Sequence, residues 1–529
     1  MSNERANGPT PVDGVRTSAS PAETWLGRGI AFLVLCVIFY RMAHSYADPD
    51  IWGHVRFGLD MLDTGKLVPL QDPYSYLNQG HPWIDNEWLA DLIVGFLFRV
   101  FGSPGLILFK AAIGVVSMGL LYRHLCRAGF NALWGGFVLL PASYLILLGF
   151  TGVRMMMFTH LFFVALMLLL VACESQRRWL WVLPLLFVVW GNLHTGVLAG
   201  VGCAGAWVGT HLIVLAWRDG VRAAVFQSPG RDYWIVGISI LLANFVNPYG
   251  VDLVVHNVTD GFAQRPENAE FAPVRIVSME GLTYLVLAGA SVAGWIYTAQ
   301  PRSLALLAVF AVTLLTPLIA IRHSPLFAVA ALALAGPHLA DLWRRWQAHR
   351  EPSPPPKLWM PAVPFIGGIA FLCLAVPQLQ CIKMDPKVAT AYPVRAVALL
   401  KDSGIKGKLV VFFDWGEYVL WHVGPNVQVS MDPRRHSAYS HAVYVQNFQF
   451  QNGVGAWDKL LDVGPADMVL YSKQFPAFNL MQARKDWALV YDDELAGLFV
   501  RRDSPSHRLL QATKARDDLP ADGAGMCFP

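Results

Sequence analysis

Long apolar stretches recur along this chain, and they constrain its fold more than any other feature. The hydrocarbon core of a bilayer is about 30 Å thick, so a helix needs roughly 20 apolar residues to cross it. The sequence therefore predicts a polytopic α-helical membrane protein. We identify about eleven such stretches, of which the fifth and the seventh are short for a full span: 29–47, 104–122, 131–149, 155–173, 180–193, 196–217, 233–246, 281–299, 303–321, 325–343 and 358–379.

The composition of the 529-residue chain supports this fold class. Hydrophobic residues make up 55% and charged residues 15% of the sequence, whereas soluble domains carry roughly 25% charged residues. These values exclude a disordered chain, a fibrous repeat and a disulfide scaffold, and they argue against a wholly soluble enzyme. The net charge of +4 gives no indication of nucleic-acid binding.

Changes in composition define the domain organisation. Residues 1–24 are polar and predict a disordered cytosolic tail, and residues 25–379 form the transmembrane domain with a first outer loop at 48–103. From 380 to 502, strand-length apolar runs alternate with helical segments, which predicts a small α/β domain. Residues 503–529 remain as a C-terminal tail. We expect strands at 408–413, 427–431, 467–472, 487–492 and 495–502, the last two forming a hairpin.

The placement of Lys and Arg predicts the orientation in the membrane. The N-terminal tail and the loops on its side carry the excess of these residues, among them Arg123, Arg177 and Arg344, so the N-terminus is predicted to be cytosolic. An odd number of spans then puts the α/β domain outside the cytoplasm. In that oxidising compartment Cys381 and Cys527 can pair, and two free thiols are the alternative.

Acidic residues and an imidazole follow the first predicted span in the motif DPDIWGH. Asp48 can cap a helix that starts at the next residue, which puts Asp50 and His54 four residues apart on one face. Such a pair can take a proton from a hydroxyl or bind a divalent cation, although an ordinary helix start fits as well. Glu87, later in the same outer loop, adds a second carboxylate or belongs to a plain amphipathic helix.

Cationic and imidazole side chains recur at the outer ends of later spans. Arg154 and the adjacent pair Arg322 and His323 are suited to bind a phosphate. His194 lies at the same predicted face. The alternatives are interfacial arginines whose head groups reach toward water and a hydrogen-bonded core histidine.

The predicted topology gathers these polar groups on one side of the membrane. Ionisable groups at a membrane edge are costly and usually have a function or a partner. Together they fit a lipid-linked anionic substrate, with its phosphate near Arg154 or Arg322 and its reacting group near Asp50. The long outer loop at 251–280 is either a lid or substrate loop at this site or a solvated connector.

Several motifs carry a resemblance to a known family. In chain order they are DPDIWGH, PWIDNEWLAD, WGNLHTG, NPYG and RHSPLF in the membrane domain, and AYPVRAVALL, DWGEYVLW and MDPRRHSAY in the α/β domain. With these motifs the chain resembles the bacterial GT-C superfamily of integral membrane glycosyltransferases, in particular the branch often called dolichyl-phosphate-mannose or RgtA/B/C/D-like. One departure is Trp52-Gly53, where many relatives show two tryptophans.

The resemblance implies a hexosyl- or pentosyltransferase of the bacterial inner membrane. Its donor is a polyprenyl-phosphate-linked sugar, and its extracytoplasmic acceptor is an envelope glycan, lipid or protein. The resemblance also implies an acidic residue of the first outer loop as base or metal ligand. Asp50 matches this position best and Asp48 second, and Glu87 resembles a further acidic loop residue.

In the leading hypothesis Asp50 accepts the proton of the acceptor hydroxyl, and His54 orients or shares it. The cofactor stays open, with a divalent cation on Asp50 and His54 as one option. Two other functions also stay open: a non-enzymatic membrane scaffold or sensor with a periplasmic α/β domain, and a lipid-linked glycan transporter.

Overall fold

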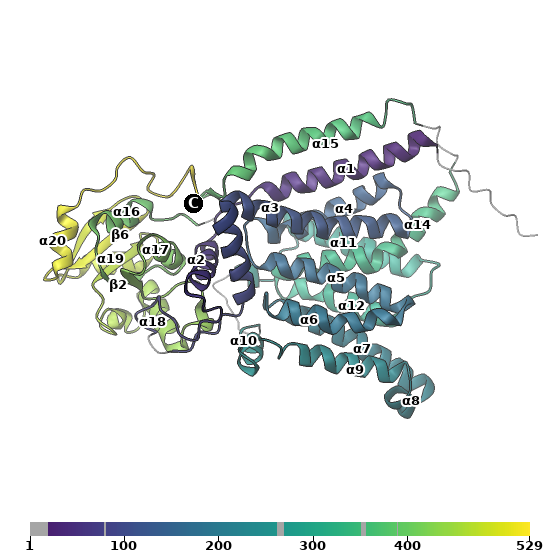
Figure 1. Cartoon of the computed structure of the whole chain (residues 1–529), viewed down its shortest axis with the longest axis horizontal. Coiled ribbons are helices and arrows are strands. Elements are labelled where there is room, and N and C mark those ends of the chain that lie inside the picture. The colour runs from purple at the N-terminus through teal and green to yellow at the C-terminus, as the bar shows by residue number, and fades with distance from the viewer. Residues whose placement is uncertain (1–19, 79–80, 262–268, 351–355, 389) are drawn as a thin grey trace, which may run out of the picture.

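The apolar stretches form long helices that lie side by side, with the α/β domain at one end of the bundle (Figure 1). The computed structural model describes residues 20–78, 81–261, 269–350, 356–388 and 390–529. Most of the predicted tail at 1–24 lies outside these residues, and α1 already begins at Pro21. The start of α1 lies at the end of the bundle that is far from the α/β domain (Figure 1).

Within the described residues, eight helices are long and apolar enough to cross a membrane. This finding confirms the predicted fold class. The eight are α1 (Pro21–Ala43), α3 (Trp88–Ala128), α4 with its short extension (Ala132–Phe150), α5 (Met156–Ser175), α7 (Val197–Asp219), α11 (Met279–Tyr297), the segment Ile321–Ala348 that contains α13 (Ser324–Ala330) and α14 (Gly336–Ala348), and α15 with its extension (Ala362–Gln380).

The other three predicted spans form shorter helices. The fifth and the seventh are short, as the sequence indicates, and the ninth is shorter than predicted. They are α6 (Leu183–Gly191), α9 (Gly230–Ala243) and α12 (Leu304–Leu315). Two more short helices, α8 (Val221–Phe226) and α10 (Val251–Gly261), lie in the connections. The remainder of the predicted loop 251–280 is described only from residue 269 onward.

The first outer loop folds around α2 (Pro49–Thr64), which lies between the bundle and the α/β domain (Figure 1). Asp48 caps this helix, since its Oδ1 accepts the Ile51 N–H at 3.2 Å. α2 packs tightly on the first part of α3 because Gly58 and Gly95 lack side chains. A Cβ at Gly58 would lie 1.9 Å from the Asp91 carbonyl oxygen.

α3 consists of an outer segment and a membrane-spanning segment. Gly102, with φ of 61°, interrupts the helical backbone between them, in a conformation that glycine adopts without steric cost. Pro104 follows and can start the second segment. This break lets the outer part of α3 follow α2 while the rest enters the bundle.

The α/β domain contains a five-stranded sheet in the order β3-β2-β4-β6-β5. β2 is parallel to β3 and β4, and β6 is antiparallel to β4 and to β5. β5 and β6 form the predicted hairpin. The elements are α16 (Val394–Ser403), β2 (Gly407–Val411), α17 (Gly416–Val423), β3 (Val427–Val429), α18 (His441–Asn452), β4 (Met468–Ser472), α19 (Pro476–Ala483), β5 (Trp487–Asp492), β6 (Ala496–Arg501) and α20 (Pro505–Ala512).

The C-terminal segment returns to the junction between the two parts. β7 (Met526–Cys527) pairs with β1 (Lys383–Met384), and Cys381 forms a disulfide with Cys527. Near the end of the chain, Ser103 of α3 donates a hydrogen bond to the Phe528 carbonyl at 3.2 Å. The segment 503–529, which the sequence sets apart as a tail, is thus fastened to both the α/β domain and the bundle.

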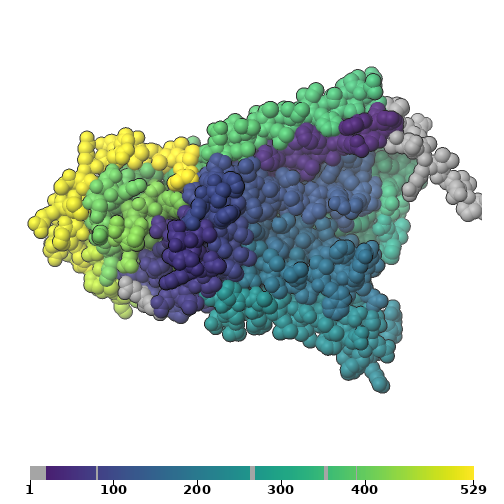
Figure 2. Space-filling model, in the orientation of Figure 1, coloured from purple at the N-terminus to yellow at the C-terminus, as the bar shows by residue number. Residues whose placement is uncertain are grey.

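Arg434 of the α/β domain holds the first outer loop. Its side chain donates to Asp432 on its own loop and to Asp72 on the outer loop, the latter at 2.9 Å. The guanidinium also lies over the rings of Phe57 and Trp83, 5.0 and 4.6 Å from their centroids. Figure 2 shows the outer loop and α2 between the α/β domain and the bundle. Their position is therefore set by both parts.

Candidate functional site

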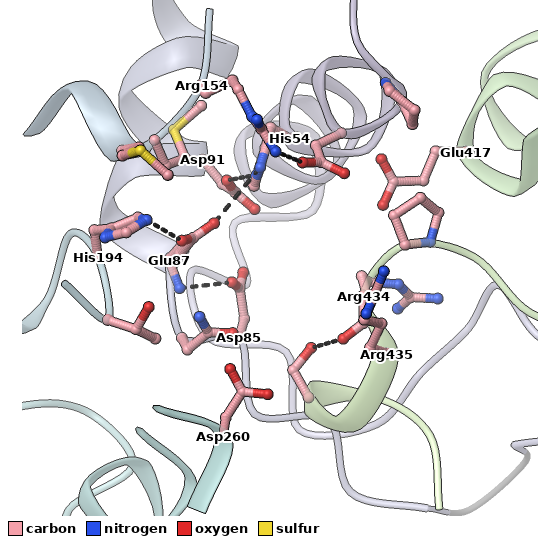
Figure 3. Close-up of a pocket in the computed structure, with 18 of the residues that line it drawn as sticks. His54, Asp85, Glu87, Asp91, Arg154, His194, Asp260, Glu417, Arg434 and Arg435 are labelled. Carbon is pink, nitrogen blue, oxygen red and sulfur yellow. Dashed lines mark hydrogen bonds and ion pairs between the residues drawn. The ribbon is translucent and has the colours of Figure 1, made fainter. Parts of the chain in front are cut away.

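A cavity of about 310 Å³ lies where α2, the outer loop, the bundle and the α/β domain meet (Figure 3). Asp48 lies next to it and contacts one of the lining residues. His323 is not among the described lining residues, although its neighbour in the chain is. Six residues singled out from the sequence line the cavity together: Asp50, His54, Glu87, Arg154, His194 and Arg322.

The bundle presents the starts of four helical segments to this cavity. Glu87 directly precedes α3, Arg154 precedes α5, His194 precedes α7 and Arg322 precedes α13. Helix N-termini carry partial positive charge and unpaired N–H groups, which favour anions. The helix starts therefore favour an anion at this wall of the cavity.

Arg154 is surrounded by carboxylates. Its Nε lies 3.2 Å from Asp48, one Nη lies 3.2 Å from Asp50, and the other Nη lies 3.0 Å from Glu270. Burial disfavours the charged guanidinium, but these carboxylates outweigh burial and raise the pKa of Arg154 above its ordinary value. Burial raises the pKa of Asp48 to about 6, against the attraction of Arg154.

His54 has partners other than the predicted Asp50. Its Nδ1 lies 2.6 Å from Asp91 and its Nε2 lies 3.5 Å from Glu87. Burial favours the neutral ring, but the carboxylates of Asp91 and Glu87 outweigh burial and raise the pKa of His54 well above its ordinary value. His54 is therefore a cation near neutral pH, while Asp50 pairs with Arg154.

Glu87 lies between two imidazoles. Its second carboxylate oxygen is 3.3 Å from Nε2 of His194. The Nδ1 of His194 accepts the Gly196 N–H at 2.8 Å, so the ring proton is on Nε2 and points to Glu87. Burial lowers the pKa of His194 to about 3 and raises the pKa of Glu87 to about 7. Glu87 is thus oriented by a neutral and a charged ring, with a pKa suited to proton exchange.

The α/β domain adds side chains that our sequence analysis did not single out. Glu417, Arg434 and Arg435 lie on one side of the cavity, across from His194 and Glu87 (Figure 3). Glu417 is buried and accepts the Gly53 N–H at 2.9 Å. Burial raises its pKa well above the ordinary value.

The structure gives a reason for glycine at position 53, where many members of the family that the sequence resembles have a second tryptophan. A Cβ at this position would lie 2.2 Å from Cδ of Glu417. The missing side chain therefore makes room for the Glu417 carboxyl against α2. Several site residues lie in the motifs of the sequence analysis but were not recognised there, among them Asp91 in PWIDNEWLAD, Glu417 in DWGEYVLW, and Arg434 and Arg435 in MDPRRHSAY. The four-residue spacing of Glu87 and Asp91 was the signal that could have revealed Asp91.

The proposed metal ligands have other partners. Asp50 pairs with Arg154, and both ring nitrogens of His54 face carboxylates. Among the described residues, no group of three or more His, Cys, Asp or Glu is arranged to hold a metal ion. The residues present therefore do not fit a divalent cation on Asp50 and His54.

No protein-family model matches the sequence, and no curated protein matches it. Solved structures do resemble it. An oligosaccharyltransferase from Archaeoglobus fulgidus, tethered to an acceptor peptide with the NVT sequon, matches with a TM-score of 0.54 and 13% identity over 84% of this chain and 69% of its own. Its apo form matches with a TM-score of 0.50 and 14% identity, over 85% of this chain and 69% of its own.

ArnT from Cupriavidus metallidurans, bound to undecaprenyl phosphate, matches with a TM-score of 0.49 and 13% identity over 91% of this chain and 98% of its own. At these identities the likeness to the oligosaccharyltransferase concerns the fold. It extends over most of the chain. The chain therefore has a fold similar to that of this oligosaccharyltransferase.

Proposed function

We propose that the chain is a glycosyltransferase that moves a sugar from a polyprenyl-phosphate carrier to an acceptor at the end of the bundle that carries the α/β domain. The observation that carries this proposal is that Asp50, Arg154 and Arg322 line one cavity. A carboxylate can take a proton from a hydroxyl, and a guanidinium can bind a phosphate. Sugar transfer from a phosphate carrier needs both groups at the same place.

The reaction follows from this arrangement. The hydroxyl oxygen of the acceptor attacks the anomeric carbon of the sugar, and the bond from that carbon to the phosphate oxygen breaks. The phosphate leaves with the bonding electron pair, and the hydroxyl proton passes to Asp50. Arg154 and Arg322 stabilise the negative charge that develops on the phosphate.

His54 has a different role from the one first expected. With its ring charged between Asp91 and Glu87, it cannot share the proton that Asp50 receives. We assign it to electrostatic stabilisation of the anionic ligand. Glu87 is the second carboxyl that can exchange a proton in this site.

The reaction compartment follows from the α/β domain. The disulfide between Cys381 and Cys527 supports an oxidising environment for this domain and therefore an extracytoplasmic site. We infer that in a bacterium the chain lies in the inner membrane with its N-terminus in the cytosol. The acceptor is then an envelope glycan, lipid or protein.

A transfer assay tests the proposal. The purified chain in lipid nanodiscs is mixed with a panel of polyprenyl-phosphate sugars and an envelope extract, and transferred label is counted. We expect the wild type to transfer at least one sugar and Asp50→Asn to lose roughly 100-fold or more in rate. Asp462→Asn, at an exposed position on the α/β domain, is the matched control and should retain activity. Full activity of the Asp50→Asn variant would contradict the assignment of the base.

A further inference from the structure

A short turn from the loop before α11 contacts both arginines of the proposed phosphate site. This turn is η3 (Ala269–Phe271). Glu270 lies 3.0 Å from one Nη of Arg154, and the ring centroid of Phe271 lies 4.5 Å from Cζ of Arg322. Two consecutive residues thus contact the two cationic side chains to which we assign the phosphate.

Arg154 has three carboxylate partners, and they are not held equally. Asp48 is fixed as the cap of α2, and Asp50 lies on the first turn of the same helix. The side chain of Glu270 belongs to the separate turn and is 42% exposed, compared with 17% for Asp48 and 34% for Asp50. Because three negative charges repel one another around one cation, Glu270 is the carboxylate that leaves Arg154 at the lowest cost.

A phosphate has the charge and shape to take the place of that carboxylate. A guanidinium presents two N–H groups in a plane that match two oxygens of either a carboxylate or a phosphate. A phosphate monoester carries a charge of about −1.5 to −2 near neutral pH, more than one carboxylate. A phosphate bound between Arg154 and Arg322 also meets the partial positive charge at the helix starts.

We propose that Glu270 sets the affinity of the phosphate site, because the phosphate of a polyprenyl-phosphate ligand replaces its carboxylate on Arg154. The ring of Phe271 then moves away from the Arg322 guanidinium. Arg322 becomes the second side chain that contacts the phosphate. This inference rests on the proposed function. The exchange favours the released monoester over the sugar-linked diester, since the monoester carries more charge. Because the phosphate must displace Glu270, it binds more strongly as negative charge develops on it during sugar transfer.

The test measures binding of undecaprenyl phosphate alone, with no sugar and no acceptor, to the full chain in nanodiscs. Glu270→Gln keeps the size of the side chain and removes its charge. We expect this variant to bind undecaprenyl phosphate roughly tenfold more tightly than the wild type, since the ligand no longer displaces a charge-assisted bond. The matched control is Glu280→Gln. Glu280 lies at the start of α11 and hydrogen-bonds Tyr144 instead of an arginine of the site, so its variant should bind as the wild type does.

Undecaprenol, which lacks the phosphate, separates charge from the polyprenyl chain. Its affinity should be the same in the wild type and in Glu270→Gln. Equal or weaker binding of undecaprenyl phosphate to Glu270→Gln overturns the inference and leaves the proposed function intact. An equal gain for undecaprenol also overturns it, because the effect then does not act through the phosphate. No binding of undecaprenyl phosphate to either protein contradicts both the inference and the proposed function.

Discussion

His54 and Asp91 are joined by a 2.6 Å contact between the imidazole Nδ1 and the carboxylate, which fastens α2 to the start of α3. The contact exists because Gly58 and Gly95 let the two helices approach closely. It places a charged imidazole, with a carboxylate on each side, at the wall of the cavity. The sequence predicted His54 as a site residue, but the packing of α2 on α3 determines that its partner is Asp91.

Asp91→Asn removes the strongest partner of the His54 cation. We expect a loss of about 2 kcal/mol in stability, typical of a hydrogen bond to a charged group. Because the folded pKa of His54 is raised above its ordinary value of 6.5, its stabilising contribution is complete below that value. It is lost as the pH rises through the raised pKa. The destabilisation by Asp91→Asn should therefore be largest near pH 6.5 and somewhat below it, while Asp91 stays ionised, and should shrink as the pH rises.

Thermal unfolding in detergent, measured at pH values from below 6.5 to well above it, checks the prediction. Asp462→Asn, which alters an exposed aspartate, should show no such pH dependence. A destabilisation by Asp91→Asn that grows with rising pH would show that His54 is neutral in the folded chain.

Gly53→Ala should disturb the contact between the bundle and the α/β domain. The new Cβ would lie 2.2 Å from Cδ of Glu417, so the carboxyl must move away from the Gly53 N–H. We expect a loss of about 1–3 kcal/mol from overpacking, measured by thermal unfolding. Gly202→Ala is the control, because a Cβ there meets no atom within 4 Å.

The double variant Gly53→Ala with Glu417→Ala tests whether the two positions are coupled. Removing the carboxyl makes room for the new methyl group, so the double variant should lose less than the sum of the two single losses. Strict additivity would mean that the glycine does not serve to accommodate Glu417.

Lys110→Met should destabilise the bundle although it makes α3 more apolar. Lys110 is fully buried, and its Nζ donates to the carbonyls of His44 at 2.6 Å and Phe150 at 3.1 Å. Without the Nζ group, the two carbonyls lose this hydrogen-bond donor, at a cost of about 3 kcal/mol in the free energy of unfolding. The same substitution at the exposed Lys485 provides the control for thermal unfolding. An equal or higher unfolding temperature for Lys110→Met would contradict this role.

The sequence predicted the elements well because their signals are local. All eleven apolar stretches are helical, and the five predicted strands match β2 to β6 to within about two residues. The length of α12 was the main exception among the predicted spans. Its predicted stretch continues beyond Leu315 into a short 3₁₀ turn at Thr316–Leu318, which contains Pro317.

The site could be predicted only in part, since its residues come from distant segments. The sequence could mark Asp50, Arg154 and Arg322 as unusual at a membrane edge, but not that a single cavity contains them. It could not pair Gly53 with Glu417, because that contact depends on how the α/β domain packs on α2. The structural role of Lys110 was not predicted, because a single lysine does not interrupt the apolar stretch at 104–122.

Photo-cross-linking tests most directly whether this cavity binds the lipid carrier. A photoactivatable analogue of undecaprenyl phosphate is bound to the chain in nanodiscs, irradiated, and its attachment sites are mapped by mass spectrometry. We predict attachment to the peptides that carry Arg154 or Arg322, and its suppression by excess undecaprenyl phosphate. Attachment confined to the opposite end of the bundle, for example to α8, would contradict the account.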